Sequence, residues 1–151
     1  MASSDKPNIE APARPPAARP AKAEPVAQPN PTMAIVAPAV GWLIPGAGHL
    51  IQKRWIRGAL LMISICVMFV LGLEMQGKVY RPNTGDLLDM LGFIGDLGAG
   101  GLYIVTRALD AGQGSIARAV ADYGTKFIVV AGLLNVIAAV DAHHIALGKK
   151  R

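Results

Sequence analysis

Four apolar segments follow a polar N-terminal stretch, and each is long enough to embed in a membrane as a helix. They are residues 33–51, 58–73, 87–106 and 127–147. Gly58–Leu73 is the clearest, because none of its 16 residues carries a formal charge. A helix of that length reaches about 24 Å, close to the roughly 30 Å hydrocarbon core of a bilayer. The pattern predicts an all-α integral membrane protein with three or four membrane-embedded helices.

The first apolar segment carries helix-breaking residues near its middle. Pro45, Gly46 and Gly48 stand in an otherwise uncharged stretch. Proline removes a backbone donor and glycine adds conformational freedom, so we expect the helix to break at Pro45–Gly48. A membrane tolerates such a break only where protein or water satisfies the freed backbone. We therefore expect residues 33–51 to form a re-entrant segment.

The third and fourth apolar segments are less uniform. Residues 87–106 include Asp89, Asp96 and five glycines, which leaves open whether this segment crosses the membrane. Residues 127–147 begin with a longer uncharged run and end in polar positions. The side of the membrane that holds the C-terminus depends on how many of these segments cross.

The N-terminal stretch has a different composition from the rest of the chain. Residues 1–32 contain eight of the 11 prolines and none of the 17 glycines, with few large apolar side chains. Such a segment has little surface to bury against the entropy lost on ordering. We expect a disordered Pro/Ala-rich tail over residues 1–32 and a helical membrane domain over residues 33–151.

Composition and charge agree with a membrane location. Hydrophobic residues make up 52% of the chain and charged residues 17%, against roughly 25% charged in soluble domains. A single cysteine, Cys66, excludes an intrachain disulfide. The net charge of +5 comes mainly from clusters beside apolar segments, at residues 53–57 and 149–151. The positive-inside rule explains these clusters better than nucleic-acid binding does, and predicts a cytoplasmic 53–57 loop.

The linker after the proline-glycine run resembles a known motif. Residues 44–58 read I-P-G-A-G-H-L-I-Q-K-R-W-I-R-G. This resembles the linker of the small two-transmembrane-helix domain family, G-A-H-R-F-Y-L-G-R followed by a glycine. It is closer to bacterial relatives with P-G-x-G-[HQ], many known only as uncharacterised membrane proteins. The matching positions are Pro45, Gly46, Gly48, His49, Arg54 and Gly58.

The resemblance covers about residues 33–73 and departs from the motif at two positions. Ile51 replaces an aromatic residue, and Lys53 replaces a glycine. Further on, the run G-L-L-N-x-x-A-A-x-D, which starts at Gly132, resembles the same bacterial group. The resemblance implies a membrane domain and supplies no activity. Within the motif, we expect His49 to hydrogen-bond the broken backbone rather than to act in catalysis.

Asp96 is the most unusual residue of the apolar segments. A carboxylate at the centre of a membrane helix costs about 2.5–3.5 kcal/mol on insertion scales, so it should face protein or water. In a continuous helix it would share a face with Gly92, Ala99, Gly100 and Tyr103. Two interpretations stay open, a proton or ion site and an interhelical hydrogen bond, and we favour the hydrogen bond.

Asn135 is the second polar residue of interest. It lies in an i, i+4 row with Ala131 and Ala139, where it could hydrogen-bond across helices. Further along, Asp141 and His144 are spaced to cap one another or to share a metal. Two ligands are too few for a zinc site, so we expect no metal.

The sequence contains none of the catalytic motifs G-x-S-x-G, H-E-x-x-H or the Walker loop. We therefore expect a non-catalytic structural or interaction component of a bacterial inner membrane, with no cofactor. Such a small protein should act in the lipid bilayer as a homo-oligomer or within a larger complex. An ion- or proton-conducting subunit that uses Asp96 and Asn135 is the alternative. An enzyme acting on lipid head groups is the least favoured, and the sequence identifies no small-molecule ligand.

Overall fold

The computed structural model describes residues 30–115 and 118–149. Within them the chain forms six helices and no strand beyond one isolated bridge. The helices are α1 (Pro31–Leu43), α2 (Ala47–Ile51), α3 (Trp55–Glu74), α4 (Leu87–Leu97), α5 (Gly101–Ala108) and α6 (Ala119–Ala146). The predicted all-α fold is confirmed. The predicted tail falls almost entirely on residues 1–29, which lie outside the described residues.

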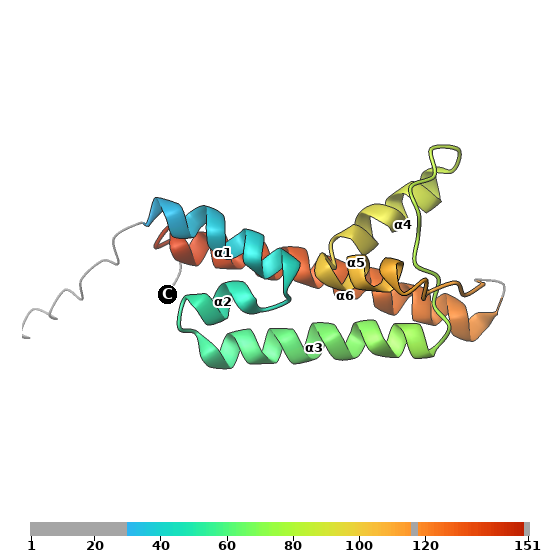
Figure 1. Cartoon of the computed structure of the whole chain (residues 1–151), viewed down its shortest axis with the longest axis horizontal. Helices are drawn as coiled ribbons and strands as arrows, with labels where there is room; N and C mark the ends of the chain where they lie inside the picture. Colours follow the sequence, from blue (N-terminus) through green and yellow to red (C-terminus); the bar gives the residue numbers. More distant parts are fainter. Residues whose placement is uncertain (1–29, 116–117, 150–151) are drawn as a thin grey trace, which may run out of the picture.

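Two helices, α3 and α6, are long and apolar enough to cross a membrane. An 18-residue window of each has a mean hydropathy of 2.3 and 1.7, and the helices span 20 and 28 residues. They run side by side along the molecule (Figure 1). Ile65 and Phe69 of α3 are buried together with Ile128 of α6 in one hydrophobic cluster. α6 begins eight residues before the predicted start at residue 127. The chain is therefore a membrane protein by the length and composition of these helices.

The first apolar segment folds back on itself as an α1–α2 hairpin. The helix breaks where the proline-glycine run predicts, and Gly46 has a φ of 78°. Both ends of the hairpin lie beside the end of α6. Asn30 N–H donates to the carbonyl of Ala146 over 3.4 Å, and Gln52 Nε2 donates to the carbonyl of Ala142 over 2.9 Å. The hairpin therefore starts and finishes at the same end of the molecule.

The third apolar segment is also a hairpin, which differs from the continuous helix face expected for residues 87–106. The chain bends by 111° between α4 and α5. Beside the segment, Val79 N–H donates to the carbonyl of Gly112 over 2.8 Å, and Lys78 pairs with Gln113. Since one of these paired loops precedes α4 and the other follows α5, the segment returns to the end from which it started.

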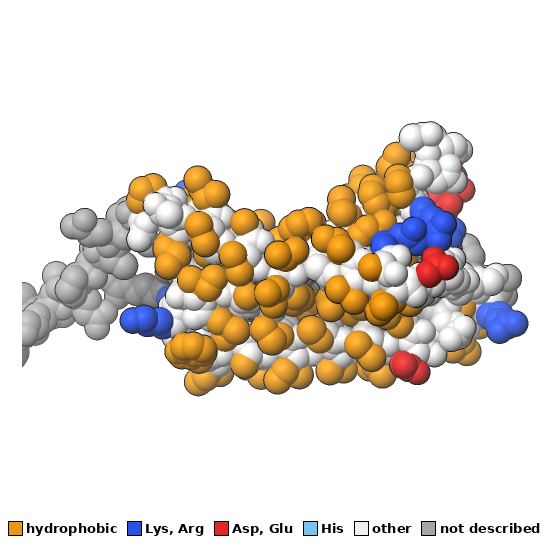
Figure 2. Space-filling model, in the orientation of Figure 1, with side chains coloured by type: hydrophobic (Ala, Val, Ile, Leu, Met, Phe, Trp, Pro, Cys, Tyr) orange, Lys and Arg blue, Asp and Glu red, His pale blue; other side chains and the backbone are white. Residues whose placement is uncertain are grey.

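Each hairpin precedes one long helix, and the two hairpins start from opposite ends of the molecule (Figure 1). We call one end the basic end, because its described charged residues are Lys53, Arg54, Arg57, Asp141 and Lys149. The other is the mixed-charge end, with Glu74, Lys78, Arg81, Asp86, Asp89, Arg107, Asp110, Arg118, Asp122 and Lys126. On the face shown in Figure 2, hydrophobic side chains cover the region between these ends.

This arrangement makes a prediction about membrane topology. Single cysteines at Gln76 and Gln113, in a chain with Cys66→Ala, should both react with an impermeant maleimide from outside intact cells. A cysteine at Gln52 should react only after permeabilisation, because it lies at the basic end. Labelling of Gln113 from the same side as Gln52 would instead mean that residues 87–106 cross the membrane.

Candidate functional site

The tips of the two hairpins meet near the middle of the molecule, against α6. Trp42 Nε1, at the end of α1, donates to the carbonyl of Leu97 over 3.1 Å. The side chain of Asn135 is fully buried, and its Nδ2 donates to the carbonyls of Trp42 and Gly98, over 2.9 and 3.0 Å. We call this group the tip junction: Trp42, Leu97, Gly98, Gly100 and Asn135. Asn135 is thus a bridge between both helix ends and α6.

Glycine is required at the tip of the second hairpin. Gly100 has a φ of 59°, in the left-handed region that side chains rarely adopt. A Cβ atom at this position would also overlap the carbonyl oxygen of Trp42. The backbone of one hairpin therefore lies directly against the backbone of the other, which brings the two carbonyls within reach of one amide group.

The two tips share a short sequence pattern that the sequence analysis missed. Gly46–Leu50 reads G-A-G-H-L, and Gly98–Leu102 reads G-A-G-G-L. In both cases the pattern lies at the break between two short helices. A comparison of the chain with itself could have found this repeat and predicted the second break from the first.

The linker residues of the resemblance pack α2 between its neighbours. A Cβ atom on Gly46 would overlap the carbonyl oxygen of Gly58, and one on Gly48 would overlap that of Ala37. Pro45 is buried in the turn, and Arg54 N–H donates to the carbonyl of His49 over 3.0 Å. The motif therefore marks the close approach of α2 to α1 and α3.

His49 makes a side-chain contact rather than the backbone contact expected. Its ring is 1% exposed, and Nε2 lies 3.2 Å from Oδ2 of Asp141 on α6. Nearby, Nδ1 of His143 lies 2.6 Å from the carbonyl oxygen of Ala34 on α1. These contacts fasten the first hairpin to the end of α6. Within the described residues no group of three or more metal-ligating side chains comes together.

Asp96 binds the loop before α4 and is separate from the tip junction's hydrogen bonds. Its Oδ2 accepts the N–H of Tyr80 over 2.6 Å, and the Tyr103 hydroxyl donates to the carbonyl of Tyr80 over 3.3 Å. Among the described residues its buried Oδ1 has no hydrogen-bond partner, and the same holds for Oδ1 of Asn135. Asp96 thus joins a loop to a helix, where we had favoured a bond between two helices.

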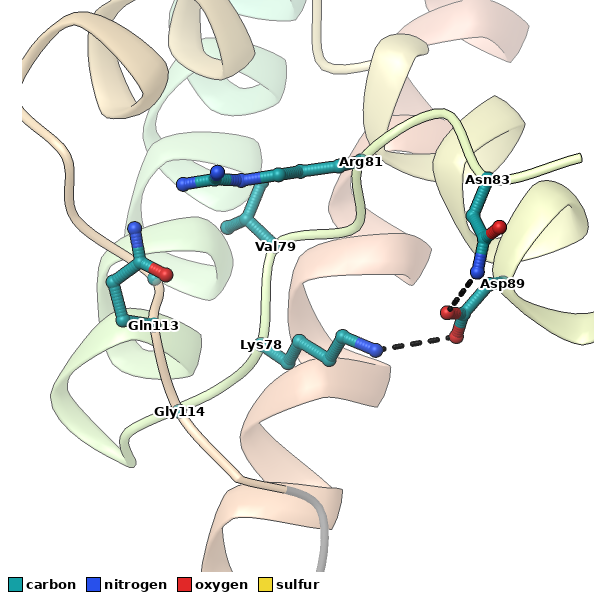
Figure 3. A pocket seen from close by; sticks show the side chains of 8 residues that line it. Lys78, Val79, Arg81, Asn83, Asp89, Gln113 and Gly114 are labelled. Atoms are coloured by element: carbon teal, nitrogen blue, oxygen red, sulfur yellow. Dashed lines mark hydrogen bonds and ion pairs between the residues drawn. The ribbon is translucent and has the colours of Figure 1, made fainter. Parts of the chain in front are cut away.

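A polar cavity of about 440 Å³ lies at the mixed-charge end, between the loop before α4 and the loop after α5. We call it the polar pocket; it is lined by Lys78, Val79, Arg81, Asn83, Asp89, Gly112, Gln113 and Gly114. Lys78 Nζ and Asn83 Nδ2 bind the two carboxylate oxygens of Asp89, over 3.2 and 3.3 Å (Figure 3). Arg81 Nη2 lies 3.3 Å from Oδ1 of Asp110.

The pocket carries both signs of charge and was not predicted, because its residues come from α4 and from two loops about 30 positions apart. Beside it, Lys78 Nζ lies 4.6 Å from the centre of the Tyr80 ring. Burial raises the pKa of the Tyr80 hydroxyl above its ordinary value, so this phenol stays neutral at physiological pH.

Comparisons with known proteins identify a family without an assigned activity. A family model described as "Family of unknown function (DUF6677)" matches residues 36–151, which is well over half of the chain. No curated protein and no solved structure matches the chain.

The tip junction makes a prediction about stability. Asn135→Ala leaves the buried carbonyls of Trp42 and Gly98 without their side-chain donor, at a cost of about 1–3 kcal/mol. We expect a lower thermal unfolding temperature of the protein purified in mild detergent. Leu133→Ala, at a half-exposed position of the same helix, is the matched control. Equal unfolding temperatures for the two variants would show that the amide does not hold the tips.

Proposed function

The chain belongs to this family of unknown function, and we propose that it is a non-catalytic structural or interaction component of a bacterial inner membrane. The supporting observation is that the buried polar side chains between the two ends are hydrogen-bonded to backbone groups. Asn135 donates to two backbone carbonyls and Asp96 accepts a backbone N–H. Side chains bonded to backbone groups in this way stabilise a shape, which suits a scaffold.

The outer face of α3 is the surface we propose for assembly. Five of its exposed large side chains lie at alternating spacings of four and three residues: Ile56, Leu60, Ile63, Val67 and Val70. This spacing forms one stripe that can pack against another helix at a shallow left-handed crossing. Helix association in lipid depends on such packing, because lipid chains are as apolar as the side chains. We propose a homo-oligomer or a larger complex built on this stripe.

A measurement of particle mass tests the assembly. In mild detergent, the protein part of the particle, without its bound detergent, should have a mass above the 15.8 kDa of one chain. Ile63→Ala combined with Val67→Ala should weaken the association by roughly tenfold, because two truncated side chains lose their packing contacts. Ile137→Ala, at an exposed position of α6, is the control. A monomer that retains no other protein from native membranes would contradict the proposal.

A specific observation favours a second candidate, a small ion- or proton-conducting subunit. Oppositely directed broken helices that meet inside the membrane are the arrangement that builds substrate sites in many transporters. Here the buried Oδ1 atoms of Asp96 and Asn135 lack hydrogen-bond partners among the described residues, so each has spare capacity to bind. The two candidates differ in whether the charge of Asp96 is needed.

The substitution Asp96→Asn separates the two candidates. An asparagine can still accept the Tyr80 N–H with its amide oxygen, so the variant should reach near-normal membrane levels. The asparagine side chain carries no charge and does not titrate near neutral pH. On the scaffold proposal, proteoliposomes of either protein show no proton or cation flux above that of empty vesicles. Flux through the parent that disappears in the variant would reject the scaffold and support the conducting subunit.

A further inference from the structure

The polar pocket is lined by charges of both signs that a ligand can reach, Lys78, Arg81 and Asp89. The Lys78–Asp89 pair has side-chain exposures of 32% and 25%, and the Arg81–Asp110 pair is more exposed still. A purely anionic ligand at Lys78 would lie next to the carboxylate of Asp89, only 3.2 Å away. A zwitterion avoids this repulsion, because its anionic group can bind the cations while its ammonium binds the carboxylate. The charges of the pocket therefore favour a zwitterionic ligand.

A second cavity, of about 470 Å³, lies between α4 and α6. We call it the α4 groove. Its lining changes character along α6: Asp122 and Lys126 stand near the start of the helix, and Val129 and Val130 follow deeper in. Leu88 and Leu91 of α4 line the opposite side. The groove is thus polar near the mixed-charge end and apolar toward the middle of the molecule, which is the polarity of a phospholipid seen along its length.

The pocket and the groove lie on two sides of the same structural elements. On α4, Asp89 lines the pocket and its neighbour Leu88 lines the groove. In the preceding loop, Lys78 and Arg81 line the pocket, while Tyr80 lines the groove. At their boundary, Lys78 Nζ of the pocket lies 4.6 Å from the centre of the Tyr80 ring of the groove, so one amphipathic molecule can reach both cavities.

We propose that the polar pocket and the α4 groove together bind a zwitterionic phospholipid with a primary ammonium group. The phosphate lies at Lys78 and Arg81, the ammonium lies at Asp89, and one acyl chain lies in the groove between α4 and α6. The first turn of α4 is well placed for this, because Leu87 and Leu88 are 84% and 75% exposed beside the pocket. The inference does not depend on the proposed scaffold function.

Lipid retention tests the proposal on the full chain. The protein is reconstituted with equal amounts of phosphatidylethanolamine, phosphatidylcholine and phosphatidylglycerol of identical chains, then re-extracted, and the retained lipids are counted by native mass spectrometry. Phosphatidylethanolamine should be enriched about fivefold or more, because the methylated ammonium of phosphatidylcholine has no N–H to donate and phosphatidylglycerol carries no cation. Equal retention of the three lipids, or preference for another, would overturn the proposal.

Variants of the pocket locate the lipid. Arg81→Gln should lower the amount of retained phosphatidylethanolamine about tenfold, since it removes a charged hydrogen-bond donor to the phosphate. Asn83→Ala should lower it as well, because Asn83 orients Asp89. Arg118→Gln removes an exposed cation of the same end that lines neither cavity, and should change nothing. An unchanged amount of retained phosphatidylethanolamine in both pocket variants, or an equal loss in the control, would place the lipid elsewhere and reject the assignment.

A competition arm separates the lipid from its soluble head group. Glycerophosphoethanolamine carries the same phosphate and ammonium without acyl chains. If the groove contributes as proposed, this compound should not displace the retained lipid at matched concentration. Displacement at matched concentration would show a head-group site alone, and would reject the part of the proposal that assigns a chain to the α4 groove.

Discussion

The fold depends on satisfying backbone groups where helices stop inside an apolar environment. Each unpaired carbonyl there costs a large fraction of a small domain's stability. The broken helices α1 and α4 expose such carbonyls at Trp42 and Gly98, and the amide of Asn135 binds both. This bond works only because Gly100 lets the two hairpin backbones touch.

Because the two hairpin tips meet at the centre, each hairpin starts and finishes at one end of the molecule. The two ends can therefore carry different charges. The first hairpin starts and finishes at the basic end, where His49 and Gln52 bind α6 through Asp141 and Ala142. The second starts and finishes at the mixed-charge end, where the loops on either side of it pair through Lys78 and Gln113. A basic surface suits anionic head groups, while balanced charges suit a zwitterion. The same architecture therefore presents two chemically different surfaces.

The proposed scaffold surface and the proposed lipid site use different parts of this architecture. The stripe on α3 faces away from α6 and offers packing surface, while the polar pocket and the α4 groove lie on the second hairpin. α4 also leaves the bundle at an angle (Figure 1), so its apolar side chains need lipid beside them. A lipid bound there would fill the space that the packing of α4 on α6 leaves open.

The sequence alone was enough to determine those elements that depend on residues close together in the chain. The uncharged run from Gly58 to Leu73 specified a membrane helix, and Pro45 specified the first break because proline lacks a donor. The polar residues Asp96 and Asn135 stood out against apolar neighbours, but their partners did not, since Trp42 is 93 residues from Asn135. The glycines of residues 98–101 indicated close helix packing, which holds for Gly98 against Gly132, while the approach of Trp42 to Gly100 decided the turn. The burial of side chains, the hydrogen-bond partners of Asp96 and Asn135, and the polar pocket were decided by tertiary structure. Each of them depends on segments that lie far apart in the sequence.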